Sequence, residues 1–339
     1  MSTAIRYTDL HLDDVFAAAR RISGLVRTTP FVESPVITAE SGAAAVYLKL
    51  ESLQNTGAFK VRGASNRILS LSDEERRRGV ITFSTGNHGK AVAYVAGRTG
   101  IPAVVCVSEH VPTYRVELIR SLGAEVVVKG HSQDEAEQEY FRIMEERGMI
   151  PVVPFDDPFV VAGQGTIALE MLRETPDLDV LLVPLSGGGL LAGIAMTAKL
   201  IKPDISVVGI SISQSPAMLE SLKAGHPVAV PEKETLADSL LGGIGVKNGF
   251  TLPLVRDHVD HHVVIDEDEI PRGIYYALAH HSLVIEGSAA VGIAAIQSGK
   301  VDVAGKRVGV VLSGSSVDLP QYLSVVTPFV TGDATLRSH

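Results

Sequence analysis

Short runs of aliphatic and β-branched residues recur along the chain, and longer stretches that mix polar and apolar positions separate them. The runs predict seven strands, at 45–50, 79–84, 103–108, 124–129, 180–185, 206–211 and 307–313. The stretches between them include 88–100 and 134–148, which are typical of helices. Because apolar strands alternate with helices, we expect parallel sheets with helices on both faces.

The order of these elements also predicts how the chain divides into domains. Residues 75–152 hold a compact β-α-β-α-β set, after which the chain crosses back to the remaining strands. We therefore predict an α/β protein of two domains, each a mostly parallel twisted sheet flanked by helices. The large domain would comprise 1–74 and 153–325, the small domain 75–152, and the C-terminal tail 326–339.

Composition and charge narrow the class of protein. The 339 residues include 30 basic and 39 acidic side chains, a formal net charge of −9, which leaves no broad basic patch for nucleic acid or an anionic membrane. The one cysteine, Cys106, cannot form an intramolecular disulfide and fits a reducing compartment. The first residues lack the apolar core of a signal peptide, and the apolar runs are too short to cross a bilayer. We expect a soluble, cytoplasmic protein.

The segment LSGGGLLAG (185–193) is the first candidate binding motif. Gly187, Gly188 and Gly189 follow a predicted strand and open a helix at Leu190. Their bare amides and the positive end of the helix dipole favour a bound phosphate. One alternative is a tight turn between strand and helix, for which a single glycine would suffice. Another is a dinucleotide fingerprint, but its last glycine, Gly193, would lie one residue too far along.

The segment STGNHG (84–89) also follows a predicted strand and precedes a helix. Ser84, Thr85, Asn87 and His88 are small hydrogen-bonding residues that could hold a carboxylate together with the local amides. A helix start capped by Ser, Thr or Asn explains the same residues equally well.

Lys60 stands between Phe59 and Val61 near the start of a predicted helix. The helix dipole disfavours a cation there, and apolar neighbours add a desolvation cost, so both lower the pKa of the amine. A neutral amine can form a Schiff base with an aldehyde. The alternative is a surface lysine whose stem packs along Phe59 while its charge stays in water.

Two further features carry less information. Ser313, in LSGSSVD (312–318), follows the last predicted strand and could donate to a ring nitrogen or cap a turn. The histidine pairs at 261–262 and 280–281 point to different faces, and no cysteine or acid completes a ligand set at helical or hairpin spacing. We therefore predict no metal site.

In this order, the four motifs together with AGQGTIALE (162–170) and IEGSAAVG (285–292) resemble the fold type II pyridoxal-phosphate enzymes, which share the fold of the tryptophan synthase β subunit. The pattern is similar to threonine/serine dehydratases and serine racemase, and closest in appearance to the hydroxyectoine-utilisation dehydratases. The resemblance extends over nearly the whole chain. It implies pyridoxal phosphate as cofactor, a small amino acid as substrate, and a homodimer.

The resemblance implies a role for each residue at a matching position. Lys60 would hold the cofactor covalently and remove the α-proton of the substrate. Phe59 would pack beside the ring, Asn87 would bond its 3-hydroxyl, and Ser313 would donate to the pyridine nitrogen. The phosphate would bind the amides of Gly187, Gly188, Gly189 and Leu190.

The substrate carboxylate would be cradled by Ser84, Thr85, Gly86, Asn87 and His88. Thr85 matches the serine that serine racemase uses on the opposite face of the ring, so we expect it to be catalytic and racemisation to be possible but less favoured.

The implied reaction is elimination of water from a β-hydroxy amino acid such as threonine or serine, which yields a 2-oxo acid and ammonia. Phenylserine or a hydroxyectoine-derived substrate, racemisation, β-replacement and a catalytically silent binding protein stay open as alternatives.

The sequence departs from the family pattern at a few positions. Ala58 and Ser316 stand where many members have serine and asparagine, and Ser315 replaces a glycine. The divalent-cation site of several relatives would fall at Ser211 and Ala217, which are not acidic, so we expect that site to be absent or much weakened. The chain ends soon after the serine motif, so we expect no C-terminal regulatory domain.

Overall fold

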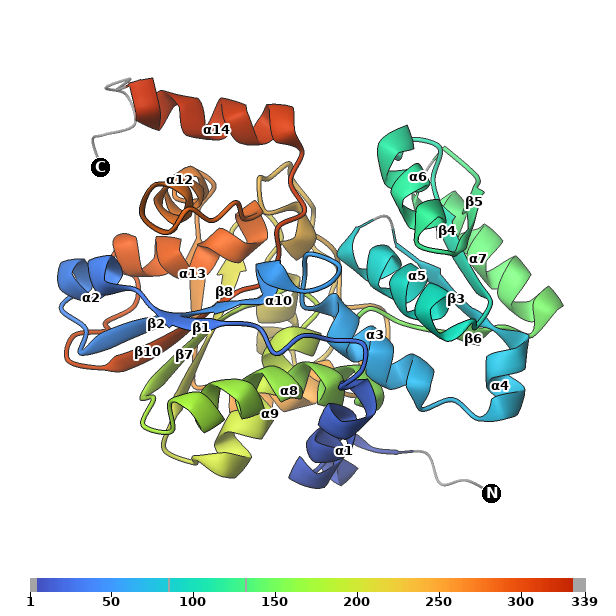
Figure 1. Cartoon of the computed structure of the whole chain (residues 1–339), viewed down its shortest axis with the longest axis horizontal. Coiled ribbons are helices and arrows are strands. Elements are labelled where there is room, and N and C mark those ends of the chain that lie inside the picture. Colours follow the sequence, from blue (N-terminus) through green and yellow to red (C-terminus); the bar gives the residue numbers. More distant parts are fainter. Residues whose placement is uncertain (1–4, 85, 132, 332–339) are drawn as a thin grey trace.

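The computed structural model describes residues 5–84, 86–131 and 133–331, and it contains two sheets (Figure 1). The larger sheet has six strands, in the order β1 (Phe31–Glu33), β2 (Ala45–Leu50), β10 (Arg307–Leu312), β7 (Val180–Pro184), β8 (Ser206–Ile212) and β9 (His261–Ile265). Its strands pair in parallel except β1, which runs antiparallel to β2. The smaller sheet is parallel throughout, in the order β5 (Glu125–Val128), β4 (Ala103–Val107), β3 (Val80–Phe83) and β6 (Ile150–Pro151).

Helices cover both faces of the large sheet. Strand β7 shows why: its successive residues are all buried, and they alternate between two apolar cores. One core is closed by α2 (Pro35–Ser41), α12 (Ile270–His281), α13 (Gly287–Gln297) and α14 (Leu319–Thr331). The other is closed by α1 (Leu12–Ile22), α8 (Pro158–Glu174), α9 (Gly189–Ile201), α10 (Ala217–Ala224) and α11 (Thr251–His258).

The small sheet is covered in the same way. Helices α5 (Asn87–Thr99) and α6 (Thr113–Ser121) pack on one face and α7 (Gln133–Arg147) on the other. Helix α3 (Lys60–Leu69) joins the two halves, because it packs its apolar side against α5 and lies against α8 of the large sheet. Figure 1 shows α3 between the two sheets and α4 (Asp73–Arg78) leading into the smaller one.

These features confirm the predicted α/β class with parallel, helix-flanked sheets. All seven predicted strands are present, each within two residues of its predicted ends. Three strands were not predicted, β1, β6 and β9, because the first two have three and two residues and the third begins with His261 and His262. The predicted domain boundaries stay a prediction, and the one at 325 falls inside α14.

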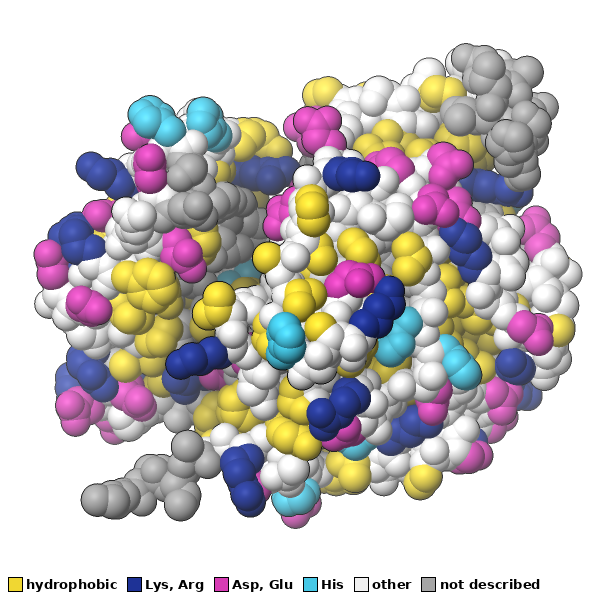
Figure 2. Space-filling view, turned by 180° about the vertical axis from the view of Figure 1, so that it is seen from behind, with side chains coloured by type: hydrophobic (Ala, Val, Ile, Leu, Met, Phe, Trp, Pro, Cys, Tyr) yellow, Lys and Arg dark blue, Asp and Glu magenta, His cyan; other side chains and the backbone are white. Residues whose placement is uncertain are grey.

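Charges are mixed over the surface. On the face shown in Figure 2, basic and acidic side chains lie interspersed. In the part of the chain that the structure describes, no helix is both long and apolar enough to cross a membrane.

Candidate active site

Lys60 is the first residue of α3, and its amine lies next to Pro154 and Phe59. Its Nζ donates to the carbonyl oxygen of Pro154 at 2.9 Å and lies 5.2 Å from the ring centre of Phe59. Burial lowers the pKa of Lys60 to about 8, and the charge of Glu286 partly offsets that effect. The residue nevertheless keeps some exposed surface. These are the properties of an amine that can react with a ligand at neutral pH.

The glycine loop follows β7 and turns into α9. Gly188 has a φ of +87°, in the left-handed region that favours glycine. Among the described residues, none accepts a hydrogen bond from four successive amides, those of Gly187, Gly188, Gly189 and Leu190. Unpaired amides at a helix N-terminus form an anion site.

The segment that follows Pro154 packs against the glycine loop. A Cβ at Gly187 would lie 2.4 Å from the ring of Phe155, so this loop can pack as it does only with glycine there. Thr251 donates from Oγ1 to the carbonyl of Gly187 at 2.8 Å. Asp156 accepts from the amides that begin α11, including that of Thr251 at 2.8 Å. Residues 154–156 therefore contact both Lys60 and the glycine loop.

The turn after β3 leads into α5. Gly86 precedes the helix, and Asn87 and His88 are buried in its first turn. The His88 Nε2–H donates to the carbonyl of Val152 at 2.8 Å, and burial lowers the pKa of His88 to about 3, so the ring is neutral. A Cβ at Gly89 would lie 2.2 Å from the carbonyl oxygen of Ser84, which fixes the tight shape of this turn.

Glu286, in the IEG motif, is a buried carboxylate at this site. It accepts from Asn87 Nδ2 at 3.1 Å to each oxygen and from the amide of Ser316 at 3.0 Å. Burial raises its pKa. The Ser316 hydroxyl in turn bonds both Asn87 Oδ1 and the amine of Lys90. The pKa of Lys90 is lowered by burial. Ser316 thus joins the turn after β3 to the segment after β10.

Ser313 directly follows β10 and is 3 % exposed. Its carbonyl accepts from the amide of Phe59 at 3.1 Å, and Ala58 bridges Gly314. Within the described ranges, the Ser313 hydroxyl has no hydrogen-bond partner, so it is free to bond a ligand.

The structure therefore brings the four motifs to one place. Phe59 bonds Ser313, and Lys60 bonds Pro154, whose neighbour Phe155 packs against Gly187. His88 bonds Val152 of the segment before Pro154, and Glu286 accepts from Asn87 and Ser316. Thr85, predicted to be catalytic, lies outside the described residues, so its prediction stays a prediction. Ser211 is buried in β8 and Ala217 begins α10. Groups of three or more His, Cys, Asp or Glu that could hold a metal do not occur among residues 5–84, 86–131 and 133–331.

Sequence reasoning missed the role of several residues. Glu286 lies in the motif IEGSAAVG, but the sequence analysis gives it no role. A single acid within a run of small apolar residues (285–296) indicates a buried carboxylate, and this pattern could have identified it. Lys90 was missed because its hydrogen-bond partner, Ser316, lies 226 residues away along the chain. The sequence could not identify Asp156, because an acid that caps a helix cannot be told from an exposed acid in a loop by its local sequence.

The residues present fit pyridoxal phosphate. Four unpaired amides suit its phosphate, a partly neutral lysine amine suits its aldehyde, and the unpaired hydroxyl of Ser313 suits a ring nitrogen.

Comparisons with known proteins agree with this chemistry. The profile of a family described as "Pyridoxal-phosphate dependent enzyme" matches residues 22–314. The chain is 45% identical over 323 residues to a "Putative threonine dehydratase" of Sinorhizobium fredii, covering 95% of this chain and 97% of that protein. It is 42% identical over 310 residues to an "L-threonine ammonia-lyase" of Thermotoga maritima, covering 91% of this chain and 76% of that protein.

A solved structure is similar over almost the same length. Maize serine racemase superposes with a TM-score of 0.87 at 32% identity, covering 96% of this chain and 99% of that one.

Proposed function

The chain belongs to the family of pyridoxal-phosphate dependent enzymes, and we propose that it is a lyase that converts a β-hydroxy amino acid such as L-threonine or L-serine into a 2-oxo acid and ammonia. Two relatives named for threonine support this reaction. When bound, pyridoxal phosphate supplies an aldehyde for an amine and a ring that stabilises negative charge at the substrate's α carbon.

One observation carries the proposal. The amine of Lys60 and a glycine loop with four unpaired amides both contact the segment 154–156. With a pKa of about 8, about a tenth of the Lys60 amine is neutral at pH 7. A neutral amine beside an anion site is what covalent capture of a phosphorylated aldehyde requires.

The proposed cofactor-binding residues are Lys60, Phe59, Asn87, Gly187, Gly188, Gly189, Leu190 and Ser313. The free amides support phosphate binding, and the free hydroxyl supports a hydrogen bond from Ser313 to the ring nitrogen. Because a serine hydroxyl is a weak acid, this nitrogen would stay unprotonated, which favours prompt elimination over a long-lived carbanion.

The proposed residues for the substrate carboxylate are Ser84, Thr85, Gly86, Asn87 and His88. The N-terminus of α5 supports an anion there, since its first amides and its dipole favour negative charge. The neutral ring of His88 adds no charge, so orientation of the carboxylate would rest on hydrogen bonds.

Proton transfer is assigned to Lys60. Its neutral amine would take the proton from the α carbon, and the electron pair of that bond would form a double bond to the β carbon as the β-hydroxyl, protonated by an acidic group of the site, leaves as water. The resulting enamine would tautomerise and hydrolyse to the 2-oxo acid and ammonia. Thr85 would stand on the opposite side of the substrate, where its hydroxyl could exchange a proton. The similarity to maize serine racemase supports keeping racemisation as the second candidate activity.

We also propose that the chain works as a homodimer in the cytoplasm. The resemblance to the family supports the first point, and a single, buried, free Cys106 suits the second.

The test is an assay of the purified enzyme loaded with pyridoxal phosphate. L-threonine and L-serine should give 2-oxobutanoate and pyruvate, each in a 1:1 ratio with ammonia. The same assay on phenylserine and 3-hydroxyaspartate defines the β-substituent, and chiral analysis of serine detects racemisation. If none of these amino acids yields a 2-oxo acid while cofactor is bound, the proposed reaction is wrong.

A further inference from the structure

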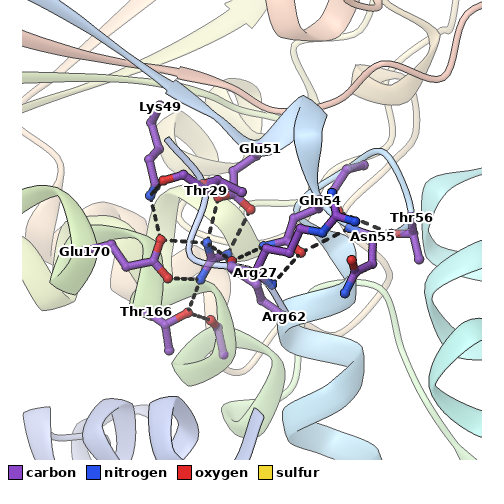
Figure 3. A network of polar contacts seen from close by, with 12 residues as sticks. Arg27, Thr29, Lys49, Glu51, Gln54, Asn55, Thr56, Arg62, Thr166 and Glu170 are labelled. Atoms are coloured by element: carbon purple, nitrogen blue, oxygen red, sulfur yellow. Dashed lines mark hydrogen bonds and ion pairs between the residues drawn. The ribbon is translucent and has the colours of Figure 1, made fainter. Parts of the chain in front are cut away.

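A network of charged residues lies on the side of α3 that faces away from the Lys60 side chain. Arg62, two residues further along α3, is 0 % exposed and forms the centre of this network (Figure 3). Its other members are Arg27, Thr29, Lys49, Glu51, Thr166 and Glu170.

The guanidinium of Arg62 bonds two carboxylates in its plane. Its Nε and Nη2 donate to Glu51, each at 2.8 Å, and its Nη1 and Nη2 donate to Glu170 at 2.6 and 2.8 Å. Thr166 Oγ1 and the carbonyl of Arg27 accept further bonds, at 3.1 and 3.3 Å. Two bidentate pairs on one fork fix its position and orientation, which a lysine cannot reproduce.

The charged side chains around Arg62 balance, because Arg62 and Lys49 pair with Glu51 and Glu170, while Arg27 takes part only through its backbone carbonyl. Lys49, also 0 % exposed, donates to Glu170 at 2.5 Å and to the carbonyl of Thr29 at 2.6 Å. The pKa of Glu51 is lowered by its partner Arg62 in spite of burial, so both stay charged. Burying three of these charges fully and Glu170 partly has a large desolvation cost, and packed apolar side chains are often as stabilising. Stability alone is therefore a weak explanation for this cluster.

Its place on α3 suggests another explanation. Residues two apart on a helix point to opposite sides, so Lys60 points toward the site while Arg62 points into the body. Arg62 joins α3 to the short 3-10 helix η2 (Glu51–Leu53) that follows β2 and, through Glu170, to α8.

Close glycine contacts complete the link to the phosphate loop. A Cβ at Gly163 of α8 would lie 2.7 Å from the Cα of Gly63 of α3, and one at Gly165 would lie 3.0 Å from the carbonyl of Gly193 of α9. The two glycines of the GQG motif thus let α8 touch α3 on one side and α9 on the other. Because α9 begins with the glycine loop, the placement of Lys60 against that loop depends on how α3 sits on α8.

We propose that Arg62 is a positioning residue, which holds the start of α3 so that the amine of Lys60 meets the cofactor aldehyde and the substrate α-proton. This role rests on the proposed function. Misplacement of a reacting group by about 1 Å can lower a rate about a hundredfold.

The test compares Arg62→Lys with Arg67→Lys. Arg67 lies on the same helix and pairs with Asp157 at the start of α8, with its Nε at 3.2 Å, but it lies two turns from Lys60. Each variant receives the same chemical change between the same two helices. The readouts are kcat and KM for L-threonine, the Tm without cofactor, and the pH dependence of the visible absorbance of the bound cofactor.

For Arg62→Lys we expect kcat to fall by about tenfold or more, KM to change much less, and the pH midpoint of the absorbance to shift. Arg67→Lys should match the wild type in all three. The proposal is overturned if Arg62→Lys keeps the wild-type kcat and pH midpoint, or if Arg67→Lys loses as much.

A second variant covers the case in which Arg62→Lys does not fold. Glu51→Gln keeps the shape of a side chain that contacts Arg62 and not Lys60, and it should shift the pH midpoint in the same direction by a smaller amount. An unchanged midpoint contradicts the proposal. If the wild type binds cofactor but eliminates no water from any amino acid, the proposed function fails, while the pH midpoint still tests the role of Arg62.

Discussion

Lys60 resolves an oddity of the sequence at the scale of one residue. A lysine between apolar neighbours is usually a surface residue with a packed stem. Here its amine instead bonds the carbonyl of Pro154, and its pKa falls to about 8. A site that lowers the pKa of a lysine destabilises the charged form, so the reactivity of Lys60 has a cost in the stability of the cofactor-free chain.

That cost predicts a pH-dependent effect of Lys60→Met. The pKa of Lys60 is lowered from 10.5 to about 8 on folding, so the penalty is fully present below pH 8 and disappears as the pH rises to 10.5. Without cofactor at pH 7, the variant should be more stable than the wild type by about 2–3 kcal/mol. The urea midpoint of each protein, measured from pH 7 to 10.5, checks this.

The control is Lys223→Met, because the side chain of Lys223 is 71% exposed. Its difference from the wild type should not depend on pH across that range. If the wild type is as stable as Lys60→Met at pH 7, folding does not lower the pKa of Lys60 and the argument is wrong.

At the scale of elements, the glycines of α8 and α9 set how closely these helices pack. A Cβ at Gly193 would lie 2.3 Å from the carbonyl oxygen of Val161 and 2.8 Å from the amide nitrogen of Gly165. Both are backbone atoms, so neither can move aside without separating the helices. The glycines in the segments 162–165 and 186–193 are therefore required for close helix packing as well as for ligand binding.

Gly193→Ala should accordingly separate α9 from α8. We expect the Tm to fall by at least about 5 °C and the apparent Kd for pyridoxal phosphate to rise, because the glycine loop begins α9. Gly24→Ala is the matched control, since a Cβ there would meet nothing within 4 Å and should leave both quantities unchanged. Equal Tm values for the two variants would contradict the packing argument.

The sequence predicted the elements well and their contacts poorly. The strands at 180–184 and 307–312 could be recognised because burial on both faces leaves an almost continuous apolar run. The motifs at strand ends could be placed because ligands of parallel sheets bind there. Pairings such as Arg62 with Glu170, 108 residues apart, depend on tertiary packing that no local pattern encodes.

At the scale of the whole molecule, the site is assembled from both sheets. Lys60 begins α3, which lies between the two halves, and the glycine loop begins a helix packed on the large sheet, whereas Asn87 begins a helix of the small one. The Asn87–Glu286 hydrogen bonds connect the two parts near Lys60. A cofactor held by the large sheet and a carboxylate held by the small one would therefore meet at the same amine.

The most direct test of this account is to find the lysine that holds the cofactor. Reduction of the loaded enzyme with borohydride fixes pyridoxal phosphate to its lysine, and digestion with mass spectrometry identifies the peptide. The account predicts the added mass on Lys60, and no such mass in Lys60→Ala. Attachment at Lys49 or Lys90, the other two lysines described near the site, would contradict it, as would a loaded wild-type enzyme that carries no reducible link.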